Sequence, residues 1–376
     1  MDTQKTKKVI ILGTSHFNTI GLVQSLGNAG LHVVGVFTKC DLLYKSVFIK
    51  EIHLVPDYQA GIEFIADKLV ENHKNVIIPG GDEAALLLEK NKDLLNEHFL
   101  FQHCKGDVTI AMAMNKNFQC KIAEQVGFDV PKSFDVEKNG KIPENIPIPC
   151  IIKPLMSCIG DKDDITVANN KTEAINVITN LLESTEKLIV QEFIERNDRE
   201  LNILGVGLTN GECIIPLSIK KERIHPKGRG SVTVGKVEPL KPELNHIVDC
   251  IKRFIKTIGY VGLFSIELMC DDKNNKIYFI EANLRNDALN PFIVRGGVNL
   301  PLLHYQDLVG ELLYKYKPTN KSFKIINEAG HISQVYRGTI NIFEWLWDVI
   351  SIHRFAMYYK QDWRLFIQQF IDKLKR

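Results

Sequence analysis

The chain has 376 residues, enough for two to three domains of roughly 150 residues each. Its 47 Lys and Arg residues nearly balance its 45 Asp and Glu residues, for a net charge of +2. That balance argues against a protein that binds nucleic acid through bulk positive charge. Hydrophobic residues make up 45% of the chain and charged residues 24%, which is typical of a packed globular protein rather than a disordered one.

No signal peptide and no membrane-spanning helix are predicted. The apolar run at residues 9–12 is too short for a signal-peptide core, and no run reaches about 18 apolar residues. The eight cysteines form no C-x-x-C pair, so the usual zinc and redox spacings are missing and buried free thiols are expected. We therefore expect a reduced, cytoplasmic location.

The first 105 residues alternate short apolar runs with helical patterns. Strands are predicted at 9–12, 31–37 and 75–78, and helices at 20–27, 62–71 and from an N-cap at Asp82 to 89. This alternation predicts a doubly wound domain with a parallel sheet. The turn from Gly13 to Gly21 lacks G-x-G-x-x-G, so it favours a tight strand-to-helix turn over a dinucleotide site. Contact between substrate and Thr14–His16 is the alternative.

The rest of the chain first mixes strands and helices and then becomes rich in strands. Helices are predicted at 118–126, 172–182 and 244–257, and strands at 149–154, 165–168, 187–193, 201–207, 212–219, 232–236, 262–270 and 276–282. The last two strands form a hairpin around residues 271–275.

This hairpin carries acidic residues in an apolar setting. Antiparallel pairing can place Glu267 opposite Glu281 on one face, where two carboxylates repel unless a cation lies between them. Asn283 follows Glu281 by two residues, so it shares that face. Oxygen ligands of this kind favour magnesium over zinc. The alternative is a pair of solvated acids on an exposed sheet face.

Two lysines precede the hairpin along the chain. Lys116 begins a predicted helix, and Lys153 ends an apolar strand before the loop of residues 155–164. A lysine ammonium suits phosphate oxygens, although either lysine by itself is an ordinary surface residue. Lys116 and Lys153 become candidate phosphate-binding residues because of their order along the chain relative to the later acids Glu267 and Glu281.

Three segments in that order carry a resemblance: Cys150–Pro154, Ile189–Ile194 and Phe279–Arg285. Over about residues 8–310 the chain resembles the ATP-grasp superfamily of carboxylate–amine ligases, in particular the branch of D-aspartate and amino-acid ligases. The resemblance implies an α/β fold in which a doubly wound N-terminal domain is followed by two α+β lobes that enclose ATP. The implied divisions are an N-terminal domain at 1–110, a middle lobe at 111–195, a C-terminal lobe with the metal site at 196–315, and an aromatic-rich helical tail at 316–376.

The resemblance also implies roles for individual residues. ATP and magnesium are the expected cofactors, with two ions and with manganese as a possible substitute. The implied ATP-binding residues are Lys116, Lys153, Ser157, Gly160, Lys162, Gln191, Glu192, Phe193, Ile194 and Glu200; the metal ligands are Glu267, Glu281 and Asn283; and the catalytic residues are Arg285 and Lys153. The phosphate loop departs from the family pattern, since it has one glycine and three acids, which puts its closure over ATP in question.

The segment from Lys220 to Gly230 contains six basic residues and two glycines between predicted strands. It is interpreted as a mobile loop that grips an anionic substrate, with a solvated surface loop as the alternative. Arg223 and Arg229 from this loop, together with Arg295, are the candidate substrate residues.

The C-terminal tail contains all three tryptophans of the chain. Helical spacing of apolar residues at 366, 367, 370, 371 and 374 predicts a helix packed back on the domain. The alternative is an amphipathic helix that rests on a membrane surface or a partner protein, which would place the protein at the membrane periphery.

Taken together, the sequence predicts an ATP-dependent ligase that joins a small-molecule carboxylate to an amine through an acyl phosphate, and no nucleic-acid partner. Two alternatives remain open. One is a non-catalytic nucleotide-binding or scaffold protein of the same fold, and the other is an NAD(P)-dependent oxidoreductase built on the N-terminal domain.

Overall fold

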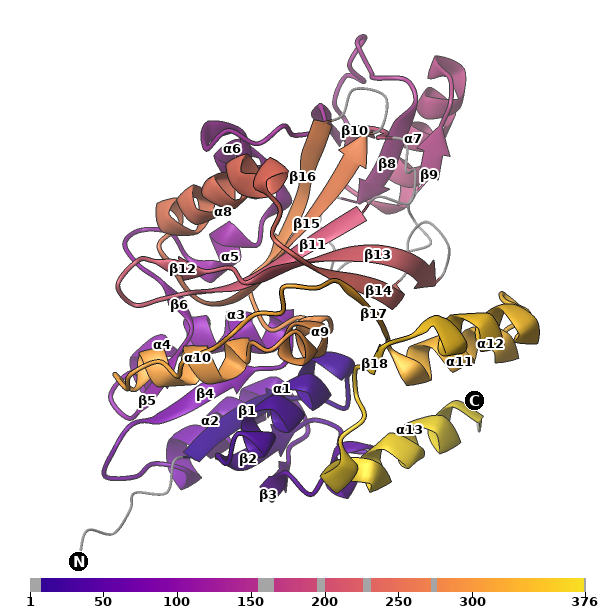
Figure 1. Cartoon of the computed structure of the whole chain (residues 1–376). Helices are drawn as coiled ribbons and strands as arrows, with labels where there is room; N and C mark the ends of the chain where they lie inside the picture. Colours follow the sequence, from indigo (N-terminus) through magenta and orange to yellow (C-terminus); the bar gives the residue numbers. More distant parts are fainter. Residues whose placement is uncertain (1–7, 155–165, 195–199, 226–230, 272–275, 375–376) are drawn as a thin grey trace, which may run out of the picture.

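The computed structural model describes residues 8–154, 166–194, 200–225, 231–271 and 276–374. Within these ranges the chain forms three β-sheets, each with its own helices (Figure 1). The first sheet is parallel, and the other two are antiparallel except where β17 meets β18. The mixed α/β fold class implied by the resemblance is therefore confirmed.

The N-terminal sheet has five parallel strands in the order β3-β2-β1-β4-β5. Its elements are β1 (Lys8–Gly13), α1 (Phe17–Asn28), β2 (His32–Phe37), η1 (Leu43–Lys45), β3 (Ile49–Leu54), α2 (Tyr58–Lys68), β4 (Asn75–Pro79), α3 (Asp82–Lys90), α4 (Lys92–Leu95) and β5 (Phe99–Phe101). Alternate residues of β1 enter different cores: Val9 and Ile11 pack with α1, whereas Ile10 and Leu12 pack with α2 and α3. This sheet is therefore covered on both faces, as expected for a doubly wound domain.

The structure corrects two details of this region. Gly81, not Asp82, is the N-cap of α3, and Asp82 is the first residue of the helix. The pattern analysis also missed β3, an edge strand whose Ile52 and Leu54 are exposed. Because apolar side chains lie on the solvent side of β3, its alternation does not resemble that of a half-buried strand.

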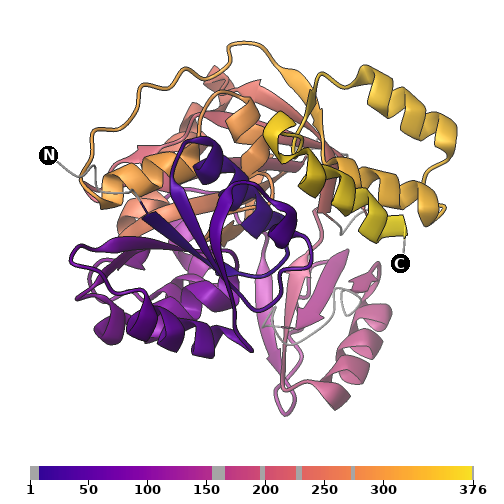
Figure 2. The same cartoon turned by 90° about the horizontal axis from the view of Figure 1, so that it is seen from below.

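The second sheet is a four-stranded antiparallel lobe in the order β7-β10-β8-β9. It contains β7 (Ser133–Glu137), β8 (Cys150–Pro154), β9 (Thr166–Ala168), α7 (Lys171–Ser184) and β10 (Lys187–Glu192). Helix α7 covers the sheet and supplies Ala174, Ile178 and Leu182 to a separate small core. The lobe projects from the rest of the molecule in both views (Figures 1 and 2).

The third sheet has nine strands, with the path β16-β15-β11-β13-β14-β17-β18 and with β12 and β6 on its margins. Its strands are β6 (His103–Cys104), β11 (Glu200–Gly207), β12 (Cys213–Ile214), β13 (Leu217–His225), β14 (Ser231–Pro239), β15 (Tyr260–Asp271), β16 (Lys276–Asn283), β17 (Phe323–Ile326) and β18 (Arg354–Phe355). The associated helices are α5 (Ile110–Ala113), α6 (Lys116–Gln125), η3 (Pro242–Leu244), α8 (Asn245–Thr257), α9 (Asn290–Arg295) and α10 (Leu300–Leu308).

Two predictions about this sheet were wrong. The strand expected at 212–219 is divided into β12 and the start of β13. The expected basic loop begins inside β13, which continues to His225 and pairs with β14, so residues 220–225 are strand. Residues 226–230 lie outside the described residues.

Helix α1 holds the N-terminal domain against α9 and α10 of the third sheet. A Cβ at Gly21 would lie 3.0 Å from Cγ of Pro291, so glycine permits this close approach. The amide of Asn286 donates to the carbonyl of Asn18 over 2.8 Å across the same boundary. The N-terminal domain and the nine-stranded sheet thus share one hydrophobic core.

The C-terminal segment adds α11 (Glu328–Tyr336), α12 (Ile342–Ser351), η4 (Lys360–Asp362) and α13 (Trp363–Leu374). The predicted tail helix is α13, which packs on η1 and α11. The buried carboxylate of Asp362 accepts hydrogen bonds from Gln24 Nε2 at 3.1 Å, Ser46 Oγ at 3.0 Å and the N–H of Val47 at 2.9 Å. These bonds tie the tail to the N-terminal domain. None of the helices in the described residues is both long and apolar enough to cross a membrane.

Candidate active site

The β15–β16 hairpin places two carboxylates directly opposite each other. Glu267 pairs with Glu281 in the strand register, and Ser265 pairs with Asn283 two positions further along, so the predicted register is confirmed. The Asn283 amide lies 3.4 Å from Oε1 of Glu281. Both glutamates are partly exposed, with 28% and 32% of their side-chain surfaces accessible. The carboxylate groups of this pair are therefore partly accessible to solvent on one side of the sheet.

Lys221 lies between Glu267 and Glu200, which is a different pair of carboxylates from the Glu267–Glu281 pair for which the sequence predicted a cation. Its Nζ lies 3.0 Å from Oε2 of Glu267 and 2.9 Å from Oε2 of Glu200, and its side chain is only 7% exposed. Burial opposes the charged lysine, but the charges of Glu267 and Glu200 outweigh it and raise the pKa of Lys221. Burial likewise opposes the charged form of Glu267, yet Lys221 lowers the pKa of that carboxyl. One ammonium group is thus shared by two carboxylates.

Sequence reasoning treated Lys221 as part of a loop and missed this position. Period-two geometry held the signal, because Leu217, Ile219 and Lys221 alternate along one face of β13. Leu217 and Ile219 are fully buried. A lysine in the next position of a buried face needs carboxylate partners, and these come from β11 and β15.

The two lysines predicted from the sequence take different partners. Lys116, the first residue of α6, lies 3.7 Å from Oε2 of Glu281. Nζ of Lys153, near the end of β8, donates to Oε1 of Gln191 on β10 over 3.0 Å. Lys116 therefore contacts a carboxylate of the hairpin, whereas Lys153 contacts a side chain of the neighbouring strand β10 in its own sheet.

Arg285, just after β16, links the hairpin to the N-terminal domain. Its guanidinium donates to Asp82 at 3.0 and 3.4 Å, to Oδ1 of Asn283 at 3.1 Å and to Asp287 at 3.4 Å. Its side chain is 13% exposed, whereas that of Asp82 is 55% exposed. Asp82 was predicted only as a helix cap, and its ionic contact with Arg285 was not foreseen.

His16 borders this arginine from the turn after β1. It is the N-cap of α1, where Nδ1 accepts the N–H of Asn18 at 3.3 Å. Burial, and then the positive charge of Arg285, lower the pKa of His16 below its ordinary value. A neutral imidazole that accepts at Nδ1 carries its proton on Nε2. In this arrangement His16 is a hydrogen-bond donor at Nε2 and not a ready general base.

The remaining predicted ATP-binding residues lie along the end of β10 or outside the described residues. The N–H of Glu192 donates to the carbonyl of Lys132 and that of Phe193 to the carbonyl of Pro149, while Ile194 is buried. Ser157, Gly160, Lys162 and the substrate candidate Arg229 lie outside the described residues. Their roles stay predictions.

The other two substrate candidates are engaged by the C-terminal segment. Arg223 pairs with Asp348 of α12 at 2.8 Å. Arg295 donates to the carbonyls of Ala356 and Tyr358, and its guanidinium stacks over the ring of Tyr359. These contacts give both arginines a part in holding the tail, so their geometry lends no support to the expected substrate role.

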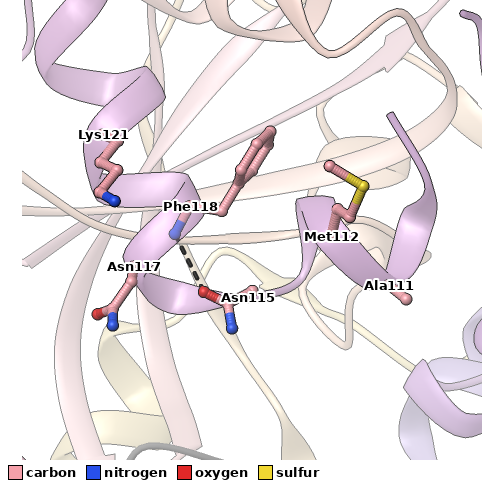
Figure 3. Close-up of a pocket in the computed structure, with 6 residues that line it drawn as sticks. All are labelled: Ala111, Met112, Asn115, Asn117, Phe118 and Lys121. Atoms are coloured by element: carbon pink, nitrogen blue, oxygen red, sulfur yellow. Dashed lines mark hydrogen bonds between the residues drawn. The ribbon is translucent and has the colours of Figure 1, made fainter. Parts of the chain in front are cut away.

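A separate open hollow of about 500 Å³ lies on α5 and α6 (Figure 3). Ala111, Met112, Asn115, Asn117, Phe118 and Lys121 line it. The Oδ1 of Asn115 accepts the N–H of Phe118, and Asn117 donates to Asp135 of β7 over 2.7 Å. The polar groups of the hollow therefore cap α6 and join it to the four-stranded lobe.

The described residues hold no group of three or more His, Cys, Asp and Glu side chains placed to bind a metal ion. A metal at the hairpin would therefore rely on Glu267, Glu281 and the amide oxygen of Asn283. Two carboxylates and an amide are hard oxygen donors, which fit magnesium and do not suit zinc.

Residues 113–288 match the model of the ATP-grasp domain. This part of the chain is therefore similar to ATP-grasp domains. The matched range begins just before Lys116 and ends just after Arg285, so it contains Lys221 and the whole β15–β16 hairpin. It does not include Asp82 or His16, which the N-terminal domain contributes.

Known ligases are among the proteins similar to this chain. It is 22% identical to a D-aspartate ligase of Enterococcus faecium over 80% of this chain and 76% of that protein. A D-alanine–D-alanine ligase of Aquifex aeolicus is 27% identical over 47% of this chain and 61% of its own length. The N5-carboxyaminoimidazole synthetase of Staphylococcus aureus complexed with ADP superposes with a TM-score of 0.70 at 16% identity, over 89% of this chain and 86% of that one. These similarities support an ATP-grasp ligase fold and leave the substrates open.

Proposed function

We propose that this protein is an ATP- and magnesium-dependent ligase that joins a carboxylate to an amine and releases ADP and phosphate. The observation that carries the proposal is the paired Glu267 and Glu281, with Asn283 on the same strand, inside a matched ATP-grasp domain. The similarity to a D-aspartate ligase supports a small acid or amino acid as one of the substrates.

Glu267, Glu281 and Asn283 would hold magnesium, and we propose two ions with manganese as a substitute. Magnesium supplies neutralisation of the polyphosphate charge when bound. In the structure, Lys221 and Lys116 lie against these glutamates instead. Both ammonium groups would contact phosphate oxygens if these carboxylates held the metal, and Lys153 would provide a third cation on β8.

The nucleotide would lie between the four-stranded lobe and the nine-stranded sheet. We assign the adenine to the β10 end at Gln191, Glu192, Phe193 and Ile194, and the ribose hydroxyls to Glu200. The loop with Ser157, Gly160 and Lys162 would contact the phosphates. Glu200 already accepts a hydrogen bond from Lys221, which orients its carboxylate beside the same site.

The reaction needs positioning and charge neutralisation more than covalent help from the protein. The substrate carboxylate oxygen attacks the γ-phosphorus of ATP, the bond to ADP breaks, and an acyl phosphate forms. The amine nitrogen then attacks the acyl carbon, and the carbon–oxygen bond to phosphate breaks. Arg285 neutralises the acyl-phosphate oxygens, and its contacts with Asn283 and Asp287 hold the guanidinium in orientation.

The test is ADP release from ATP and magnesium, measured over pools of amino acids, small carboxylates and nucleotide-sugar acids. Release that requires one carboxylate and one amine together is the expected result. No binding of magnesium–ATP by calorimetry would overturn the proposal.

Replacement of Glu281 by Gln keeps the size of the side chain but removes a charged ligand. We expect kcat to fall by roughly 10²-fold or more, since electrostatic stabilisation of this kind is worth that much. Glu137→Gln, in an exposed pair with Lys187, is the matched control and should retain full activity. Full activity of the Glu281 variant would refute the metal assignment.

A further inference from the structure

Asp82 and Arg285 meet where the N-terminal domain borders the candidate active site. Asp82 begins α3, shortly after β4, and Arg285 follows β16. Strands β1 and β4 are neighbours, and the chain passes from β1 to β2 and β3 on one side of it and to β4 and β5 on the other (Figure 1). Doubly wound domains bind their ligands outside the carboxyl ends of the strands at such a point of reversal. Asp82 therefore lies at the edge of the N-terminal domain where a ligand is expected.

The turns that follow β1 and β4 lie against each other at this edge. A Cβ at Gly80 would lie 3.3 Å from Cα of Gly13, so glycine permits the close approach. His16, in the turn after β1, is near enough to Arg285 and Asp82 for their charges to shift its pKa in opposite directions. The two turns and the arginine that follows the hairpin thus border one region.

The guanidinium of Arg285 is already engaged within the protein on all its nitrogens. Nε and Nη2 donate to the two carboxylate oxygens of Asp82 at 3.0 and 3.4 Å. Nη2 also donates to Asn283 at 3.1 Å, and Nη1 donates to the carbonyl of Asn286 at 3.2 Å and to Asp287 at 3.4 Å. A guanidinium offers five N–H groups, so an anionic ligand gains full access to this arginine by displacing one of these partners.

Asp82 is the most easily displaced of the two acidic partners. Its side chain is 55% exposed, whereas that of Asp287 is 12% exposed. Asp287 also accepts the N–H of Leu289 over 2.9 Å, which fixes its carboxylate. Among the residues that the structure describes, Arg285 is the only hydrogen-bond partner of the Asp82 side chain. An acyl phosphate bound to Arg285 would therefore leave the carboxylate of Asp82 next to it without a cation.

The charges around this point leave a negative excess. One guanidinium faces the carboxylates of Asp82 and Asp287. His16 adds no positive charge at neutral pH, because burial and the charge of Arg285 lower its pKa. An acyl phosphate on the arginine would add further negative charge. The group that complements this region is therefore a cation, and the protonated form of an amine is one.

We propose that Asp82 binds the protonated amino group of the second substrate and thereby selects an amine that is cationic at neutral pH, such as an amino acid. The inference rests on the proposed ligase reaction and names the substrate class of its second step. In the free protein Arg285 holds the Asp82 carboxylate in place. Once the acyl phosphate takes the arginine, the same carboxylate anchors the amine beside the acyl carbon.

The test compares two nucleophiles in the Asp82→Asn variant. Hydroxylamine is small and mostly uncharged at neutral pH, so it converts an acyl phosphate to a hydroxamate without an anchor for positive charge. With the amine identified in the ADP-release screen, the KM for that amine should rise about tenfold or more, because a charge-assisted hydrogen bond is lost. Hydroxamate formation from the carboxylate, ATP and hydroxylamine should be unchanged, and Asp82→Glu, which keeps the charge, should recover part of the lost affinity.

Glu83→Gln is the matched control. Glu83 is the next acid on α3, is exposed, and its charge acts on Tyr58 of α2, so its loss should leave both reactions unchanged. Equal loss of both products in an Asp82→Asn variant that circular dichroism shows to be folded would mean that Asp82 only positions Arg285. That result, or an unchanged KM for the amine, would overturn the proposal. Absence of both products with the wild-type protein would refute the ligase reaction itself, and the proposal with it.

Discussion

The β15–β16 hairpin with Lys221 and the helix α12 depart from the usual distribution of polar and apolar groups in opposite directions. In the hairpin, charges lie in a largely buried setting, and each one has a partner of opposite sign. In α12, the large apolar side chains of Phe343, Trp347 and Ile350 face water and lie in one row. Paired charges that remain partly open can exchange partners with a charged ligand, whereas an ordered apolar row can only be covered. The comparison therefore contrasts charges that have partners within the protein with apolar side chains that have none among the described residues of the exposed row.

Removing the central charge of the hairpin site should have the largest effect on stability. Lys221→Met leaves two carboxylates without their shared cation, and we expect the free energy of unfolding to fall by about 3–5 kcal/mol. Urea unfolding followed by circular dichroism measures this. Lys187→Met, which breaks an exposed pair with Glu137, should cost less than about 1 kcal/mol. An equal loss of unfolding free energy in the two variants would show that the buried and the exposed ion pairs contribute equally to stability.

A buried carboxyl in the C-terminal segment should make that region sensitive to pH. Glu328 is buried, and burial raises its pKa from 4.5 to about 7, although the N–H groups of Met357 and Tyr358 favour the charged form. The folded protein thus binds this proton more tightly than the unfolded chain does. Its contribution to stability is complete below the unfolded pKa and is lost as pH rises toward 7.

Replacement of Glu328 by Gln removes this titration. Between pH 5 and pH 8 the variant should gain roughly 2–3 kcal/mol of unfolding free energy relative to the wild type. Urea unfolding of both proteins at each pH measures the difference, and all other titrating groups cancel in it. A difference that stays constant with pH would contradict the raised pKa.

Truncation on the exposed row of α12 should have the smallest effect on folding. Phe343→Ser should change the free energy of unfolding by no more than about 0.5 kcal/mol, because the ring already lies in water. Phe279→Ala, in the fully buried hairpin core, should cost about 3–5 kcal/mol. A loss of several kcal/mol from the Phe343 variant would mean that another part of the chain covers the row in solution.

Much of the fold could be predicted because its signals are local. The strands around Val9, Val76 and Phe264 are apolar runs bounded by glycine or polar residues, and the helix predicted at 118–126 overlaps most of α6. The edge strand β3 was missed because its apolar side chains point outward. The basic loop was predicted to begin at Lys220, which lies inside β13. The prediction relied on the number of basic residues in this segment and did not use the alternation of apolar side chains along the strand.

The candidate site divides in the same way. That Glu267 and Glu281 lie on neighbouring strands follows from the local pattern, but the register that sets them opposite each other includes a shift by one position between Glu267 and Leu268. The partners of Arg285 do not follow from any local rule, since Asp82 lies 203 residues away. The same is true of Arg295, which sequence reasoning placed near substrate and which instead stacks on Tyr359 of the tail.

The sequence by itself therefore determined much of the order of strands and helices, the resemblance to ATP-grasp ligases and the presence of two acids on one hairpin, because the hydrophobic period acts over a few residues. Only the tertiary structure decided that Lys221 lies between two carboxylates, that the N-terminal domain supplies Asp82 to Arg285, and that α13 is packed while α12 is exposed. Those outcomes depend on which distant surfaces meet, and no local pattern records that choice.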